Sequence, residues 1–242
     1  MKKIRIIKKC AFIFFIAIIL LYVIIEMIKY DVEGEKFLPF EISKILVIST
    51  IDGNPIDDEE NIWNIELKQS NDLYLYITKN DNTNESIKKI KIDNFNIIKS
   101  PNRGEVAIYR PTGDLENLYT YSEQNYISDE LTFIGSRIDD LKTLEISNDG
   151  GVIAFRVSLD NLGSYISNEL TEISYDGSLL KNININIDDI SFTLSFDISI
   201  ETNSNIIYQG NIKIDLPAKD LLETSASNFE ITDFSDVIFK RI

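Results

Sequence analysis

Runs of neighbouring carboxylates are the groups whose type and spacing come closest to a catalytic pattern in this chain. They occur at Asp57–Glu60, Asp139–Asp140 and Asp188–Asp189. Glycoside cleavage needs two carboxyl groups about 5 to 9.5 Å apart across a groove. Because adjacent acids in a strand point to opposite faces, solvated loop charge is the simpler interpretation of each run, and a surface glycan hydrolase is the alternative.

Oxygen ligands for a cation are available at Asp81–Glu85, a stretch of acids, amides and one threonine. Ca²⁺ accepts about six to eight oxygen ligands, but this stretch lacks the EF-hand spacing and its glycine. We therefore assign no metal-binding residue. A calcium-binding structural module is kept as a further alternative.

The residue types that the chain lacks exclude several kinds of catalysis. It contains no histidine, and Cys10 is its only cysteine. Ser–His and Cys–His nucleophiles and the usual zinc sites therefore cannot form. A serine–lysine pair stays open, although no spacing specifies one. We assign no catalytic residue, no cofactor-binding residue and no cofactor, and we lean against an enzyme.

A group of tyrosines lies in the least periodic part of the chain, at Tyr119, Tyr121 and Tyr126. Tyrosine rings are amphipathic, so they suit a carbohydrate or peptide surface. The same residues would also fit short strands in which each ring is half-buried. We favour this second interpretation.

Alternation of apolar and polar residues dominates the chain after residue 43 and predicts β-strands. The predicted strands are Lys44–Ile51, Ile62–Lys68, Leu73–Thr78, Ile90–Ile97, Glu105–Arg110, Leu141–Ser147, Val152–Leu159, Ile190–Ile200 and Ile206–Leu216. Short strands with frequent turns and no long amphipathic helix predict an antiparallel β-sandwich, with an open barrel as the alternative. The fold class is therefore mostly β.

Turn residues and changes of phase predict where these strands end. Asp52-Gly53 and Asn148–Gly151 predict turns, and Asp93-Asn94 predicts a turn or a bulge. Helical spacing at Asp160–Asn168 predicts one short helix. The alternating run Asn182–Ile187 predicts an edge strand.

An apolar run from Cys10 to Ile28 stands apart from the strands. Its nineteen residues make a helix of about 28 Å, which matches a hydrocarbon core of about 30 Å. Twelve residues from Ala11 to Ile25 are Ile, Leu, Phe or Val, and they contribute roughly −4 to −7 kcal/mol to insertion. We predict a transmembrane helix; the alternative is a cleaved signal peptide, but no small-x-small site follows the run.

Basic residues lie before this run, at Lys2, Lys3, Arg5, Lys8 and Lys9. Such an excess keeps the N-terminus in the cytoplasm, so the rest of the chain is predicted to lie outside. Setting aside these five residues and Glu26 leaves 19 basic and 38 acidic residues of the 24 and 39 in the chain, a net charge of −19. A domain with this charge repels nucleic acid.

Four segments carry a resemblance to a known group of proteins: Glu33–Glu35, Ser43–Thr50, Ser191–Ile200 and Ile231–Arg241. In these segments the chain resembles uncharacterised single-span membrane proteins of clostridia and related bacteria. The likeness covers most of the chain. It implies no activity and no functional residue.

These observations divide the chain into a basic cytoplasmic tail (1–9), a transmembrane helix that acts as a signal anchor (10–28), a short stalk (29–42) and an extracytoplasmic β-sandwich domain (43–242). The expected location is the cell membrane, with a single span. The expected function is a binding or scaffolding module of a bacterial cell envelope. Its expected partners are the lipid bilayer, through residues 10–28, and an envelope protein or wall component.

Overall fold

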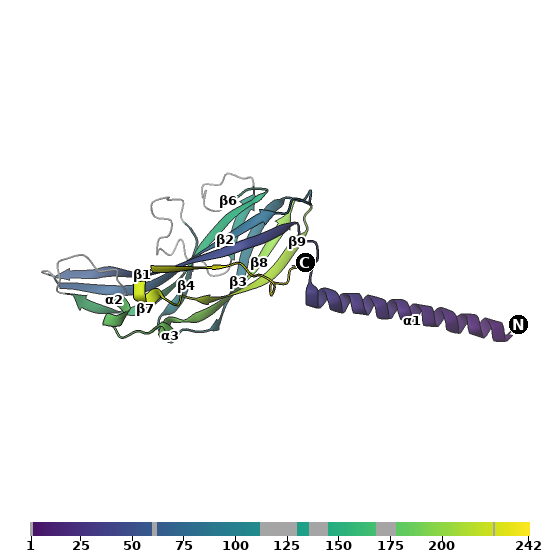
Figure 1. The fold of residues 1–242 in the computed structure, drawn as a ribbon, viewed down its shortest axis with the longest axis horizontal. Helices are drawn as coiled ribbons and strands as arrows, with labels where there is room; N and C mark the ends of the chain where they lie inside the picture. The colour runs from purple at the N-terminus through teal and green to yellow at the C-terminus, as the bar shows by residue number, and fades with distance from the viewer. Residues whose placement is uncertain (1, 60–61, 112–129, 136–144, 168–177, 225) are drawn as a thin grey trace.

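One long helix leads into a body of β-strands in the computed structural model, which describes residues 2–59, 62–111, 130–135, 145–167, 178–224 and 226–242 (Figure 1). The helices are α1 (Lys2–Glu33), α2 (Ser178–Asn182), α3 (Ile187–Ile190) and α4 (Leu221–Thr224). The strands are β1 (Phe40–Glu59), β2 (Ile62–Lys79), β3 (Ile87–Lys99), β4 (Glu105–Tyr109), β5 (Glu130–Gly135), β6 (Glu145–Ile146), β7 (Gly150–Ser167), β8 (Phe192–Thr202), β9 (Ile207–Leu216), β10 (Ala226–Ile231) and β11 (Lys240–Arg241).

The described strands form two sheets that pack face to face. Sheet A has the order β10-β1-β2-β7-β4, and sheet B has the order β11-β9-β8-β3-β5-β6. Neighbouring strands are antiparallel, apart from the short parallel pairing of β5 with β6. Rings from both sheets meet in the core, where the centroid of Phe155 lies 5.7 Å from that of Phe95 and 5.4 Å from that of Phe196. The predicted antiparallel β-sandwich behind one apolar helix is confirmed.

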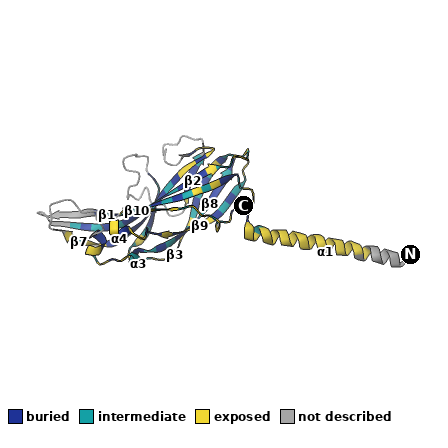
Figure 2. Ribbon diagram, in the orientation of Figure 1, coloured by how far each residue is buried: buried dark blue, intermediate teal, exposed yellow. Residues whose placement is uncertain are grey.

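Alternation along β2 shows how the sequence builds this core. Leu73, Leu75 and Ile77 are fully buried between the sheets, whereas Tyr74 and Tyr76 on the opposite face are partly exposed. Figure 2 shows the same change between buried and accessible residues along the other strands. Each fully buried aliphatic side chain contributes about 1.5 to 3 kcal/mol to folding, which is why the period of two determines which face turns inward.

Two predicted strand boundaries in sheet A are wrong. The chain does not turn at Asp52-Gly53, because β1 continues to Glu59 and pairs Asp52 with Lys68 and Gly53 with Leu67. The predicted strands Ile62–Lys68 and Leu73–Thr78 are one strand, β2. Its polar centre stays in the sheet since its side chains find hydrogen-bond partners there.

Two other predictions of local structure are also wrong. Residues 160–167 belong to β7 and not to a helix, and the strand absorbs the irregular spacing through the positive φ angles of Asn161 (58°) and Gly163 (140°). The run Asn182–Ile187 is not an edge strand: Asn182 ends α2, Ile187 begins α3, and residues 183–186 connect the two helices. A capping box between Asn186 and Asp189 favours helix there over strand.

Other predictions are confirmed. The phase change at Asp93-Asn94 is a bulge in β3, where Asn94 has a φ of 53° and the register with β8 shifts. The strands β8 and β9 form the predicted hairpin, from Phe192 opposite Leu216 to Glu201 opposite Ile207. The turn predicted at Asn148–Gly151 separates β6 from β7.

Gly150, at the start of β7, should be intolerant of any side chain. Its φ is +112°, and a Cβ placed there would lie 2.2 Å from the backbone oxygen of Ile77. We expect Gly150→Ala to lower the free energy of unfolding by about 2 kcal/mol. Gly151→Ala is the matched control, because its Cβ would meet only Ile146 Cγ1, at 3.5 Å. Chemical denaturation of both variants measures the difference, and equal stabilities would contradict the strained turn.

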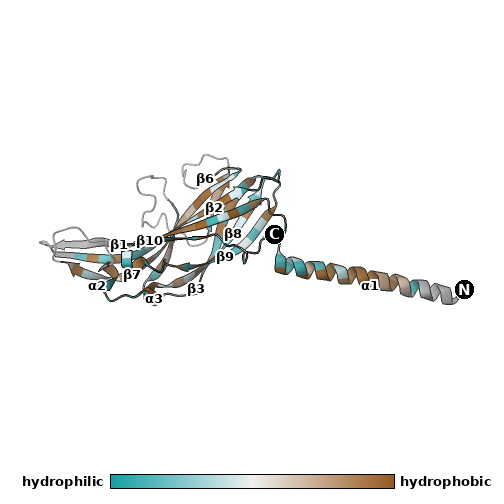
Figure 3. Ribbon diagram, in the orientation of Figure 1, coloured by the Kyte–Doolittle hydropathy of each residue, from teal (hydrophilic) through white to brown (hydrophobic). Residues whose placement is uncertain are grey.

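The helix α1 is apolar on all sides from Ala11 to Ile25, and residues 11–29 are exposed; its last turn, from Tyr30 on, contacts the C-terminal segment of the chain. Within its segment Ala11–Glu33, an 18-residue window has a mean hydropathy of 2.9 and no buried residue, and by length and composition the segment can cross a membrane. Figure 3 shows this apolar segment extending away from the β-sandwich. A helix that is hydrophobic on all sides is typical of a buried core helix or of a membrane span, so this exposed segment is a candidate span.

Candidate functional site

The end of α1 is attached to the C-terminal segment of the chain. Gly34 ends the helix with a φ of +70° and donates from its backbone N to the carbonyl oxygen of Tyr30, at 2.9 Å. The next amide, of Glu35, donates to the carbonyl oxygen of Phe239, at 2.7 Å. The backbone N of Arg241 donates to the Tyr30 hydroxyl, at 2.6 Å. Figure 1 shows the C-terminus beside this end of α1.

Charged and aromatic side chains complete this junction. Arg241 Nε lies 2.7 Å from Glu35 Oε2, and Lys240 Nζ lies 3.6 Å from Asp31 Oδ1. Phe239 packs edge-on against Phe40, at the start of β1, with ring centroids 5.2 Å apart. The end of α1 is therefore held by the C-terminal segment, which itself packs against the start of β1. The segment 29–42, which we predicted as a stalk, holds the last turn of α1, this junction and the first residues of β1.

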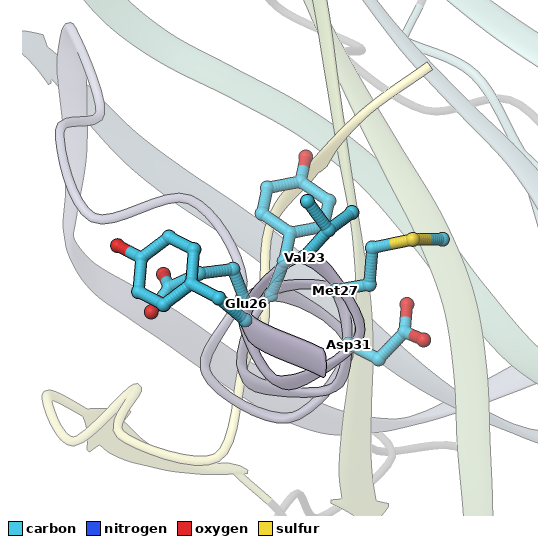
Figure 4. Close-up of a pocket in the computed structure, with 6 residues that line it drawn as sticks. Val23, Glu26, Met27 and Asp31 are labelled. Atoms are coloured by element: carbon cyan, nitrogen blue, oxygen red, sulfur yellow. The ribbon is translucent and has the colours of Figure 1, made fainter. Parts of the chain in front are cut away.

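A shallow hollow lies on the side of α1 next to the junction. Its lining consists of Tyr22, Val23, Glu26, Met27, Tyr30 and Asp31. Figure 4 shows Val23, Glu26, Met27 and Asp31 around the helix. Glu26 is paired with Lys29, whose Nζ lies 3.1 Å from Oε1. Tyr22 and Tyr30 lie toward the C-terminal end of the candidate span, and tyrosines are enriched at such ends in membrane proteins.

The outer face of sheet A carries two tyrosines with a lysine and two aliphatic residues beside them. We call this set the tyrosine surface: Lys44, Tyr74, Tyr76, Val152 and Ala154. Tyr74 lies opposite Ala154, and Tyr76 lies between Lys44 and Val152. The ammonium of Lys44 is 4.8 Å from the centroid of the Tyr76 ring and 2.6 Å from Glu230 Oε1. Val152 is 45% exposed. The result is a partly exposed aromatic face on the middle strands of a sheet.

An ion pair fixes the row next to this surface. Arg156 donates from Nε to Asp72 Oδ1, at 2.5 Å, and from Nη2 to Asp72 Oδ2, at 2.9 Å. The two side chains are 15% and 14% exposed. Burial raises the pKa of the Asp72 carboxyl above its ordinary value, although Arg156 acts in the opposite direction. Two-point contacts of this kind hold both groups in one orientation.

The following rows of the same face hold hydroxyl groups against carboxylates. Ser158 Oγ donates to Asp160 Oδ1, at 3.1 Å, and Ser70 Oγ donates to Asp52 Oδ2, at 3.4 Å. Lys68 Nζ lies 3.9 Å from Asp160 Oδ1. These two serine contacts run to carboxylates, so neither of them is the serine–lysine pair that the sequence leaves open.

A second polar group lies between the sheets and has a structural role. Ser49, Gln69 and Asn71 are fully buried and bonded to one another; for example, Ser49 Oγ donates to Asn71 Oδ1, at 2.7 Å. The backbone N of Ala218 donates to Ser49 Oγ, at 3.0 Å. Because buried polar groups need partners, this network connects the segment after β9 to the middle of sheet A.

The structure brings few of the carboxylates and tyrosines singled out in the sequence into a common site. Asp188 and Asp189 lie in α3, where the Asp189 side chain accepts a bond from the Asn186 backbone N at 3.0 Å and so caps the helix. The side chains of Asp57–Glu60, the pair Asp139–Asp140 and the tyrosines at 119, 121 and 126 lie outside the described residues. In the loop at 81–85, Glu85 accepts a bond from Ser204 Oγ, at 2.6 Å, which lowers its pKa.

The described residues contain no group of three or more acids, cysteines or histidines that could hold a metal ion. The tyrosine surface and the Asp72–Arg156 pair are not identified by sequence reasoning. The signal for the tyrosines is the alternating run LYLYIT at Leu73–Thr78, which predicts a strand but does not show which face is exposed. Nothing in the sequence signals the ion pair, because its members are far apart in the chain. Comparison with protein-family models, with curated proteins and with solved structures finds no match to this chain.

Proposed function

We propose that this protein is a binding module of a bacterial cell envelope, anchored in the cell membrane by α1 and holding its β-sandwich outside the cytoplasm. The apolar helix supports the anchor, and the basic residues before it support this orientation. A junction without a long linker keeps the domain close to the membrane. The resemblance to clostridial membrane proteins is in accord with this arrangement but contributes no residue role.

The tyrosine surface carries the binding part of the proposal. Tyr74 and Tyr76 are adjacent outward residues of a central strand, and the neighbouring Asp72–Arg156 pair holds the sheet on which they stand. A rigid tyrosine offers a large apolar face and a hydroxyl at little conformational cost, which suits an envelope protein or the sugar rings of a wall component. Scaffolding of an envelope assembly would use the same surface.

The test is binding of the full-length protein, in lipid nanodiscs, to purified wall fragments and to solubilised envelope proteins. We expect Tyr74→Ser with Tyr76→Ser to weaken binding by about thirtyfold or more, since truncation of a central aromatic contact costs about 2 kcal/mol. Ile98→Ser is the control, because Ile98 is also an exposed apolar residue but lies in sheet B. Unchanged affinity of the folded double variant would contradict this role.

A further inference from the structure

The end of the β-sandwich that adjoins α1 has an unusual surface, which we call the base: residues 31–38 together with 238–241. Phe37 is 84% exposed, the highest fraction of any large apolar side chain in the described residues. Val32 is 64% exposed and Ile238 is 39% exposed. The exposed apolar side chains of the base are therefore available to an apolar environment outside the domain.

The charges of the base balance, in contrast to the rest of the domain. Asp31, Glu33 and Glu35 are each paired with a cation, in the ion pairs Lys240–Asp31, Lys36–Glu33 and Arg241–Glu35. Beyond the N-terminal tail and the span, the chain carries 19 basic and 38 acidic residues. An acidic surface is repelled by anionic lipid headgroups, but a base with equal numbers of paired charges is not.

The geometry of the junction places the base at the level of the headgroups. The helix continues for only five residues after Ile28, from Lys29 to Glu33, which is about 7.5 Å at about 1.5 Å per residue. Each headgroup layer is about 5 to 8 Å thick. The chain then turns at Gly34 directly onto Phe239. The base therefore cannot stand clear of the lipid.

We propose that the base contacts the membrane, with Phe37 inserted among the lipid headgroups and the upper acyl chains of the leaflet from which the domain emerges. The partner is the bilayer that α1 spans, so this inference rests on the proposed anchor. Aromatic rings favour this zone, and an amphipathic surface here enters it by about 5 to 10 Å. Together with the ion pairs of the junction, the contact fixes the tilt of the domain on the membrane.

The test places an environment-sensitive fluorophore at one cysteine in the full-length protein, in vesicles of zwitterionic lipid. Cys10→Ser removes the native cysteine, and Phe37→Cys then carries the dye. Tyr22→Cys reports on the span. Ile98→Cys is the control, because Ile98 lies far from the base. Ile90 is near the base, since it pairs with Ile200 and Ile200 pairs with Tyr208, the partner of Arg241. Ile98 lies eight residues further along the same strand, about 26 Å away.

We expect the dye at residue 37 to shift to shorter wavelength and to be quenched most by lipids that carry a spin label near the headgroup. The dye at residue 98 should behave as it does in water. A water-like dye at 37 with a quenched dye at 22 would overturn membrane contact while leaving the anchor intact. A blue shift at residue 37 without lipid quenching would show that the dye is buried against protein, and would also overturn membrane contact. A dye at 22 that no lipid quenches would remove the anchor itself.

Discussion

Replacing Ile16 and Leu20 with lysine is expected to release the full-length protein from the membrane fraction. Both residues lie in the middle of the apolar segment of α1 and are exposed along it, at 40% and 57%. A lysine at the centre of a span costs about 2.5 to 3.5 kcal/mol, and each lost Ile or Leu removes about 0.3 to 0.6 kcal/mol more. The total of roughly 6 to 8 kcal/mol offsets the roughly −4 to −7 kcal/mol that favours insertion.

Alkaline extraction of membranes from cells that express each variant measures this effect. The matched control introduces the same two lysines at Ile98 and Ile166, which are exposed apolar residues of the β-sandwich, at 52% and 68%. The control protein should stay with the membrane. If the Ile16→Lys, Leu20→Lys variant also stayed there after alkaline washing, α1 would not be the anchor.

Replacing Arg156 with methionine is expected to lower the free energy of unfolding by about 3 to 5 kcal/mol, because Asp72 is left as a buried charge without its cation. Lys44→Met is the matched control. It breaks an ion pair with Glu230 whose side chains are 32% and 47% exposed, and pairs of that kind are worth about 0 to 1 kcal/mol. Chemical denaturation at neutral pH measures both. Similar losses of unfolding free energy in the two variants would show that the Asp72–Arg156 pair contributes no more than an exposed ion pair.

The pH dependence of this deficit gives a second readout. Burial already raises the pKa of Asp72 in the folded protein, and Arg156 is the group that lowers it. Loss of Arg156 should therefore raise this pKa further. A carboxyl with a raised pKa stabilises the fold below its unfolded pKa, and this contribution is lost as pH rises through the folded pKa. The deficit of Arg156→Met should accordingly shrink as the pH falls from 7 towards 4, and a deficit independent of pH would contradict the assignment.

The parts of the fold that the sequence predicts are those in which apolar residues alternate without interruption. The hairpin of β8 and β9 and the buried face of Leu73, Leu75 and Ile77 follow from a period of two, because only one face can enter the core. The apolar helix follows from its length and composition. These signals are contained in one segment of the sequence and need no knowledge of the partner strands.

The predictions fail where tertiary contacts override a local signal. Gln69 and Asn71 look like the end of a strand, yet both are buried, because Asn71 accepts a hydrogen bond from Ser49 on β1 and exchanges hydrogen bonds with Gln69. Asp52-Gly53 looks like a turn, but the partner strand β2 continues past it.

The candidate site was hidden for the same reason. Asp72 and Arg156 meet only through the register of β2 with β7, and no local pattern contains that register. The two tyrosines of β2 were visible in the sequence, but their partial exposure depends on what the rest of sheet A leaves uncovered.

The orientation of the domain across the membrane is the central claim, and labelling of one cysteine tests it most directly. The Cys10→Ser, Ile98→Cys protein carries its only thiol at an exposed residue far from the helix. Intact protoplasts that express it are treated with a maleimide that cannot cross the membrane, and lysed protoplasts serve as the reference. We expect full labelling before lysis. Labelling that appears only after lysis would place the β-sandwich in the cytoplasm and contradict the account.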